Sequence, residues 1–333
     1  MGVTTVLLSV FCLVLLSVPG FILGKTKMLP ENAAKVLTTV LLFAGQPLLS
    51  FMSFQKTEYS ADVVKNLGIV AGLAAAVHVI MIIILFGIFY RKAANDKKYR
   101  VVSFASMFGN CGFMGLPFLQ MLFSNGSAEA IMYGAVVVAV FNFFSWTVGI
   151  FMITRDKKYI SIKKAILNPP FIALIVSLPL FLILKKPINL IGNEGTFVRE
   201  LFQKIYLSFN YLSDLVTPLS MIILGYRLSQ MHVKDVFLCK HSYISMTFKL
   251  IVMPALTFLF CTLLGVEEVI KYALFFEFCM PTATQTLLFS EQFDGGEQYT
   301  ASSAVLLSSI MSVATIPLMF LIFSSIFGCS IAL

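Results

Sequence analysis

Residues 101–123 read VVSFASMFGNCGFMGLPFLQMLF and contain no charged side chain. As one helix the stretch would be roughly 35 Å long, enough to cross a hydrocarbon core of about 30 Å. Its middle holds residues that interrupt helices: Gly109, Asn110, Gly112, Gly115 and Pro117. Glycine costs about 1 kcal/mol and proline about 3 kcal/mol in a helix interior. Irregular backbone at membrane depth is tolerated only where protein or a water-filled cavity satisfies it, so the break is expected to line a site.

The composition places the whole chain in a membrane. Of its 333 residues, 59% are hydrophobic and 12% are charged, whereas soluble domains carry about 25% charged residues. Several apolar runs reach the ~18 residues typical of a membrane helix. We therefore predict an all-α, multi-pass protein of the cell membrane. The net charge of +8 is assigned to short basic loops, so no nucleic-acid partner is expected.

The apolar pattern predicts ten spans, grouped as a first five-helix repeat over 1–165 and a second over 166–333. Helix-breaking residues recur at an offset of 171 positions, because Pro47 corresponds to Pro218 and Asn110 to Pro281. Interrupted spans at matching positions are typical of inverted-repeat transporters, and five spans per repeat invert the second half. The predicted spans are 3–24, 33–54, 64–90, 101–123, 130–154, 168–185, 205–228, 243–264, 269–289 and 301–327.

The loop charges predict the orientation. With both termini outside the cell, the inner loops hold 15 Lys and Arg residues and the outer loops hold 5. The inner group comprises the basic stretches 91–100 and 155–164, together with Lys25, Lys27, Arg227, Lys234 and Lys240. Cytoplasmic loops carry an excess of Lys and Arg, so both termini are predicted to be extracytoplasmic.

Two facing breaks would form an anion site. A helix that restarts in mid-membrane exposes unpaired N–H groups and the positive end of its dipole. The fourth and ninth spans enter from opposite sides, so their breaks can cross at the midplane and bind a carboxylate. Asn110 adds a donor at the first break, and Pro281 forces the second, with Thr282, Thr284 and Gln285 after it. The alternative is a pair of kinked helices with a purely structural role.

Several stretches resemble motifs of the auxin efflux carrier family, which includes plant PIN carriers and bacterial organic-anion permeases. PLLSF at 47–51 is similar to the second-helix motif of that family. NCGFMGLPFL at 110–119 is similar to the fourth-helix motif N-T-x-x-x-G-[IL]-P-[IL]-L. Further resemblances, in helices five, seven and nine, are Asn142 with Trp146, LSD at 212–214 and MPTAT at 280–284. The matches keep their order over nearly the whole chain.

The resemblance implies a transport domain of helices 3, 4, 5, 8, 9 and 10. This domain would move against a scaffold of helices 1, 2, 6 and 7 in an elevator-type cycle of alternating access. It also implies substrate contacts from Asn110 and Asn142, with Ser50 on the scaffold side. The remaining candidates for substrate binding are Gln46, Cys111, Pro281, Thr282, Thr284 and Gln285. The helix-break residues are Gly109, Gly112, Pro117 and Pro281.

Four ionisable side chains inside the predicted spans are candidates for coupling: Glu277, Asp214, Lys249 and His78. A charge inside the membrane is functional by default. Glu277 precedes Pro281 by one helical turn, so it can carry a coupling proton or form a buried pair with a lysine such as Lys249. His78 is either a pH switch or a hydrogen-bonded structural histidine.

We therefore predict a secondary active transporter of small organic anions, either auxin-like monocarboxylates or malate-type dicarboxylates. The sequence has no nucleophile–base pair, metal-ligand spacing or phosphate loop, so no enzyme activity, metal or cofactor is expected. The predicted partners are the anion, the bilayer and a coupling ion, proton or sodium, and a homodimer is compatible with the sequence. Two alternatives stay open: a sodium-coupled carrier of the bile-acid-symporter type, and a membrane sensor or scaffold that binds an anion without transporting it.

Overall fold

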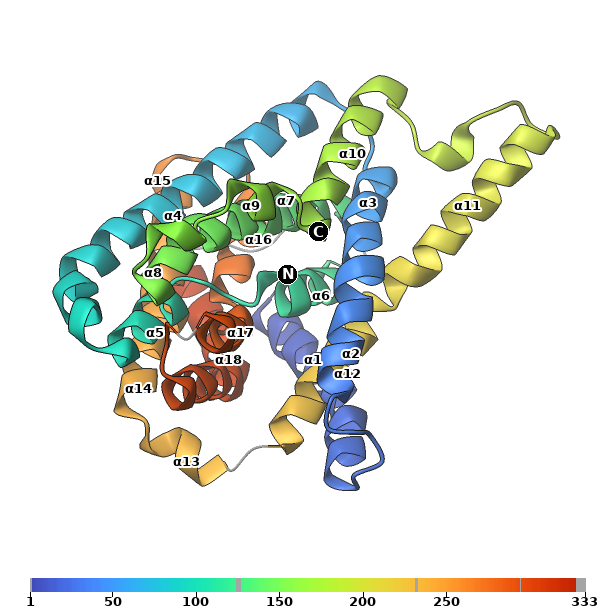
Figure 1. Cartoon of the computed structure of the whole chain (residues 1–333). Helices are drawn as coiled ribbons and strands as arrows, with labels where there is room; N and C mark the ends of the chain where they lie inside the picture. The colour runs from blue at the N-terminus through green and yellow to red at the C-terminus, as the bar shows by residue number, and fades with distance from the viewer. Residues whose placement is uncertain (1, 124–126, 231–232, 294, 328–333) are drawn as a thin grey trace.

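The computed structural model describes residues 2–123, 127–230, 233–293 and 295–327 (Figure 1). Throughout these residues the regular structure is helical, and the only strand-like pairing is a bridge between Gly109 and Thr282. Eight helical stretches are long and apolar enough to cross a membrane. They coincide with eight predicted spans: Val3–Lys25, Ala33–Lys56, Ala61–Asn95, Ala128–Thr154, Lys157–Leu190, Phe197–Ser229, Lys240–Leu263 and Gln298–Phe327. The predicted spans 101–123 and 269–289 are not among the eight because each is interrupted.

The first half of the chain contains three single π-helical turns. Two of them, η1 (Leu41–Gly45) and η3 (Ser145–Gly149), lie inside helices, and the third, η2 (Cys111–Gly115), begins one. Such turns often occur at functional sites, and η2 follows the first break directly. The elements in order are α1 (Val3–Lys25), α2 (Ala33–Val40), η1 (Leu41–Gly45), α3 (Gln46–Lys56), α4 (Ala61–Asn95), α5 (Lys97–Ala105), η2 (Cys111–Gly115), α6 (Leu116–Leu122), α7 (Ala128–Phe144), η3 (Ser145–Gly149) and α8 (Ile150–Thr154).

Two short helices follow, and the rest of the chain again contains long and interrupted helices. Its elements are η4 (Lys157–Tyr159), α9 (Ile162–Ile166), α10 (Pro169–Leu184), η5 (Ile188–Leu190), α11 (Phe197–Asp214), α12 (Val216–Ser229), α13 (Val233–Leu238), α14 (Lys240–Thr247), η6 (Phe248–Val252), α15 (Met253–Leu263), α16 (Glu268–Cys279), α17 (Gln285–Gln292) and α18 (Gln298–Phe327). The predicted start of the sixth span is confirmed, since the Asn168 side chain accepts a hydrogen bond from the Phe171 N–H at 3.0 Å.

Three predicted boundaries are wrong. The stretch 91–100 is not a loop, because α4 runs to Asn95 and α5 starts at Lys97. Asp96 starts this second helix by accepting a hydrogen bond from the Lys98 N–H at 2.9 Å. The seventh span begins at Phe197 rather than at residue 205, and Thr196 is the N-cap of its first helix. Arg227 does not lie in a loop but in the last turn of α12.

The helices form two groups (Figure 1). The first, on the right of the view, contains α1–α3 and α10–α12, and the second contains α4, α5, α7–α9 and α14–α18. In the first group α1 and α12 are in backbone contact, because a Cβ at Gly20 would overlap the carbonyl of Ile222 and one at Gly225 would overlap the carbonyl of Ser17. The interrupted stretch around η2 and α6 lies between the two groups.

Candidate functional site

Both predicted breaks are present. α5 ends at Ala105 and the chain becomes helical again at Cys111, while α16 ends at Cys279 and α17 begins at Gln285. Of the predicted helix-break residues, Gly109 lies in the first break, whereas Gly112 and Pro117 lie inside the helix Cys111–Leu122 that follows it. Pro281 lies inside the second break.

The two breaks are in direct contact. The Asn110 N–H donates to the Pro281 carbonyl at 2.6 Å, and the Ala283 N–H donates to the Phe108 carbonyl at 2.8 Å. These bonds run in the antiparallel sense. Each break therefore satisfies backbone groups that the other leaves without a helical partner.

Thr282 anchors the second break to its surroundings. Its hydroxyl donates to the Ala105 carbonyl at 3.0 Å, at the end of α5. Its N–H donates to the Ser308 hydroxyl of α18 at 3.0 Å. The side chain is fully buried and lines neither of the two cavities described below, and its hydrogen bonds hold the crossing in place.

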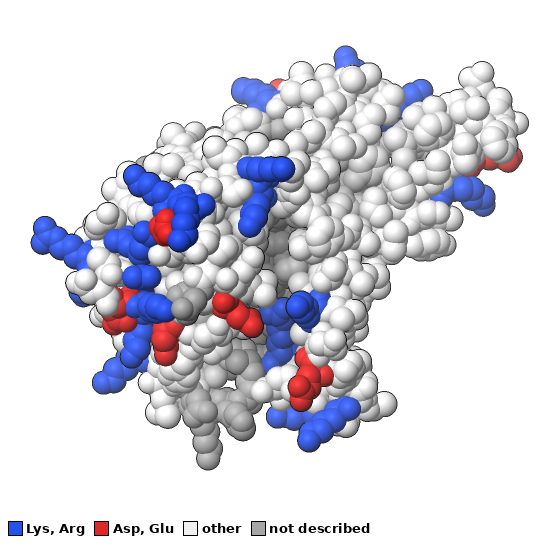
Figure 2. Space-filling model, in the orientation of Figure 1, with Lys and Arg blue, Asp and Glu red and all other residues white. Residues whose placement is uncertain are grey.

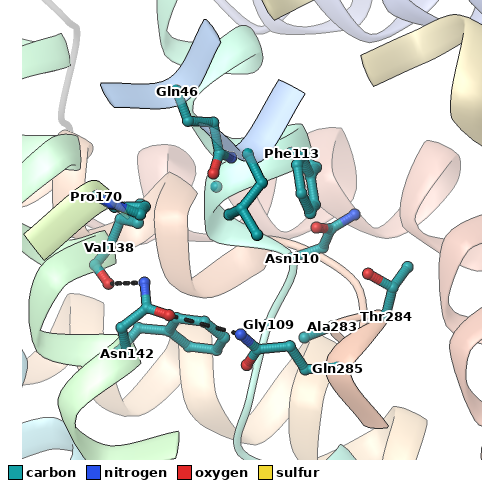
Figure 3. Close-up of a pocket in the computed structure, with 13 residues that line it drawn as sticks. Gln46, Gly109, Asn110, Phe113, Val138, Asn142, Pro170, Ala283, Thr284 and Gln285 are labelled. Atoms are coloured by element: carbon teal, nitrogen blue, oxygen red, sulfur yellow. Dashed lines mark hydrogen bonds between the residues drawn. The ribbon is translucent and has the colours of Figure 1, made fainter. Parts of the chain in front are cut away.

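A cavity lies on one side of the crossing, between the two helix groups (Figure 3). Its lining residues are Leu42, Gln46, Gly109, Asn110, Gly112, Phe113, Val138, Phe141, Asn142, Pro170, Ala283, Thr284 and Gln285. The space open to the centre of a water-sized sphere is about 40 Å³. Among the described residues that line it, none carries a charge. The polar lining consists of four side-chain amides and one hydroxyl.

The amides differ in how they are held. The Asn142 amide donates to the Val138 carbonyl at 2.8 Å, and Gln285 donates to the Asn142 oxygen at 3.5 Å. The Ser145 hydroxyl donates to the Gln285 oxygen at 2.9 Å. Gln46 reaches the cavity from the opposite helix group, and its buried amide nitrogen has no partner among the described residues. The Gln46 nitrogen is thus a free donor beside the start of a helix.

A lysine lies on the other side of the crossing. Lys249, fully buried in η6, donates from Nζ to the Phe278 carbonyl at 2.8 Å and contacts Met253 Sδ at 3.4 Å. Phe278 belongs to the last turn of α16, whose carbonyls carry partial negative charge. A Cβ at Gly109 would lie 2.5 Å from Lys249 Cε, so the lysine packs against both breaks.

Glu277 is buried near this lysine but does not pair with it. The residue is 1% exposed, and neither carboxyl oxygen has a hydrogen-bond partner among the described residues. The carboxyl group fits between two glycines: a Cβ at Gly134 would lie 2.9 Å from Oε1, and one at Gly115 would overlap Oε2. The alternative predicted from the sequence, a direct ion pair between Glu277 and Lys249, is therefore wrong: among the described residues these two form none.

Comparison of the sequence with known proteins also indicates transport. The family model described as "Membrane transport protein" matches residues 3–320. The chain belongs to this family. An uncharacterized transporter of Methanocaldococcus jannaschii is 30% identical over 316 residues, which cover 94% of this chain and 96% of the relative. These findings confirm the resemblance to auxin efflux carriers and identify a multi-pass membrane transport protein.

Several predicted residues of this transport protein lie away from the cavity. Ser50 and Cys111 are buried but do not line it. The Asp214 side chain lies within the span Phe197–Ser229, but it is 54% exposed and 4.0 Å from Lys56, so it is not buried among the helices as Glu277 is. His78 is buried, with Nδ1 2.7 Å from the Ala74 carbonyl, and its ring stacks on that of Phe144. These contacts fit the structural alternative for His78.

Arg227 of the membrane transport protein is a further candidate site residue, which is not among the residues predicted from the sequence. It lines a second cavity that shares Asn110, Phe113 and Thr284 with the first. The remaining lining residues of that second cavity are Thr38, Ser220, Ile223 and Leu224. The available signal was the spacing of Ser220, Ile223, Leu224 and Arg227, which places them on one helical face. No metal cluster is present in the described part of the chain, and Cys329 lies outside it.

Proposed function

We propose that this membrane transport protein is a secondary active transporter of small organic anions that works by elevator-type alternating access. The observation that carries the proposal is the hydrogen-bonded crossing of two broken helices beside an uncharged, amide-lined cavity. A site of this kind is typical of transporters built from inverted repeats. The crossing supports ten spans in two five-helix repeats, over residues 1–165 and 166–333.

The donors around the cavity favour an anion. Two helices begin at its wall, Cys111–Leu122 and α17, and helix starts carry unpaired N–H groups. The side chains of Asn110 and Gln46 reach the same space. No carboxylate lines the cavity within the described residues, so a bound anion meets no like charge.

The dimensions of the cavity favour a small substrate. One water requires about 10–15 Å³ on a comparable measure, so 40 Å³ accommodates a few waters or a carboxyl-sized group. Ring-bearing, auxin-like acids contain more atoms than four-carbon diacids and would require more opening of the two helix groups. Within the predicted substrate class, this supports compact acids of the malate type over ring-bearing, auxin-like acids.

The cavity is lined by residues from both helix groups, which supports a division into a scaffold and a moving domain. Leu42, Gln46 and Pro170 come from the group containing α1–α3 and α10–α12, and the other lining residues come from the crossing and α7. Movement of one group against the other would carry the site across the membrane. Lys and Arg side chains gather over α5, α8 and α9 (Figure 2), which supports a cytoplasmic location for that end and extracytoplasmic termini.

The buried carboxyl group of Glu277 is our candidate for the coupling proton. An ionised carboxylate without partners is costly in a dry interior, whereas its protonated form is tolerated. The test imposes pH and sodium gradients separately on proteoliposomes. We expect wild-type flux to follow the pH gradient and Glu277→Gln, which cannot ionise, to lose that dependence. Flux that follows only the sodium gradient would instead support the sodium-coupled alternative.

The proposed transport is tested by uptake of labelled malate and related acids into proteoliposomes. We expect accumulation that Asn110→Ala lowers by at least about tenfold, since truncating a group in a binding site costs on the order of 1–3 kcal/mol. Asn210→Ala is the matched control, because Asn210 lies on α11 outside the cavity. Binding without flux under every gradient would exclude transport and favour the sensor alternative.

A further inference from the structure

The helix α12 has two distinct faces. One face packs on α1 through Gly225, where the two backbones touch. The other face presents Ser220, Ile223, Leu224 and Arg227 to the second cavity. Residues three, four and seven positions apart share one side of a helix. Arg227, although it lies in the last turn of the helix, is therefore directed toward the site.

The guanidinium group of Arg227 is only partly satisfied. One terminal nitrogen donates to the Thr38 hydroxyl at 3.4 Å, and the buried Nε has no partner among the described residues. No described carboxylate lies within 4.0 Å of it. Arginine has five N–H donors and keeps its charge, so a partly buried guanidinium without a counter-ion favours an anionic ligand.

The two cavities are adjacent chambers of one site. Asn110, Phe113 and Thr284 line both of them. The first chamber offers neutral donors and helix starts, and the second, with about 20 Å³ of water-sized space, offers the guanidinium group. One acidic group of a ligand can be bound at the helix starts while a second reaches Arg227.

We propose that Arg227 forms a second anion-binding subsite that selects compact dicarboxylates over monocarboxylates of the same skeleton. The proposal rests on the proposed function and assigns the residue that distinguishes the two acid classes. Arg227 belongs to α12 and Asn110 to the crossing, so a dicarboxylate would link the two helix groups. A charge-assisted bond to carboxylate is stronger than a neutral one, which explains the discrimination.

The experiment uses acid pairs that differ by one carboxylate: malate and lactate, succinate and propionate, malonate and acetate. Affinities are measured by titration of the purified full chain and by competition with uptake in proteoliposomes. We expect wild type to prefer at least one dicarboxylate to its partner by about tenfold or more, as for loss of a charge-assisted bond. Arg227→Gln should weaken dicarboxylate binding by a similar factor and leave monocarboxylate binding within about twofold.

Two further variants separate the subsite from general damage. Arg227→Lys keeps the positive charge and should retain most of the preference, whereas Arg91→Gln, on the exposed end of α4, should change neither class. The thermal midpoint without ligand reports whether Arg227→Gln is folded. If wild type transports both acid classes equally, or if folded Arg227→Gln and Arg227→Lys lower both equally, the subsite is overturned while transport stands. If wild type transports none of these acids, the proposed function itself fails.

Discussion

The two sides of the helix crossing differ in charge. The first cavity is lined by Gln46, Asn142 and Gln285, all neutral, and a charged side chain enters only in the second cavity, at Arg227. The opposite side carries the fully buried charge-bearing groups of Lys249 and Glu277. The helix starts face the cavity, and the end of α16 faces Lys249. One pair of breaks thus offers partial positive charge to a ligand and partial negative charge to a resident ammonium group. Ligand binding is assigned to the cavity side, and structural support by Lys249 and proton coupling by Glu277 are assigned to the opposite side.

The largest effect on stability is expected behind the crossing, at Gly115. In Gly115→Ala the new Cβ would overlap the carboxyl group of Glu277, which has little room to move because Gly134 contacts it from the other side. We expect the free energy of unfolding to fall by about 1–3 kcal/mol, as for overpacking of a tight core. Thermal and denaturant unfolding of the purified protein measure the change.

The control for this prediction is Gly72→Ala. No atom lies within 4 Å of a Cβ added at Gly72, in the middle of α4, so the substitution should be neutral or stabilising. The cost of Gly115→Ala should shrink in a Glu277→Ala background, because the overlapping group is gone. Equal costs in both backgrounds would show that the carboxyl group is not what fills this space.

Lys249→Met should have a somewhat smaller effect on stability. It removes the donor to the Phe278 carbonyl and leaves that carbonyl unpaired at a buried helix end. We expect a loss of about 1–2 kcal/mol in the free energy of unfolding. Lys65→Met, at an exposed position of α4, is the control. A more stable Lys249→Met protein would contradict the supporting role, because it would mean that the cost of burying the ammonium group exceeds its contribution.

On the cavity side, Gln46→Met should affect function rather than stability. The amide nitrogen of Gln46 has no partner, so an apolar side chain of similar size should change the unfolding free energy by less than about 1 kcal/mol. Uptake should nevertheless fall, since a donor beside the start of η2 is lost. Transport kinetics and unfolding are measured on the same preparation.

Gln55→Met, in the same helix, is the matched control, and the opposite result is expected for it. Gln55 is buried, and its oxygen accepts a hydrogen bond from the Ile188 N–H at 2.8 Å. Its loss should cost about 1–3 kcal/mol of stability and leave substrate affinity unchanged. If Gln46→Met is the less stable of the two and transports normally, the functional assignment of the cavity side is wrong.

The sequence was sufficient to predict both breaks, because Gly109 and Pro281 interrupt stretches whose apolar character otherwise demands a helix. It was also sufficient for the start of α10 at Asn168, where an N-cap residue precedes two prolines. These features are local, and local backbone preferences determine them.

The direction of side chains was less predictable. In a span that is apolar on all sides, periodicity does not distinguish the face toward a cavity from the face toward other helices. Ser50 and Gln46 are one turn apart on α3, yet only Gln46 lines the cavity. The sequence prediction counts Arg227 among the loop charges that determine orientation, because a charge near the end of a span resembles a loop residue. Its role depends on α2 and the crossing, which are distant in sequence.

The smallest effect is expected from Asp214→Asn. Asp214 lies at the end of α11, exposed, with Lys56 at 4.0 Å and the Asn210 amide at 2.7 Å. Exposed ion pairs contribute about 0–1 kcal/mol, so the unfolding free energy should change by less than about 0.5 kcal/mol. Flux and its dependence on the pH gradient should equal those of wild type, in contrast to Glu277→Gln. A loss of gradient dependence in Asp214→Asn would move the coupling site from the buried side of the crossing to the scaffold.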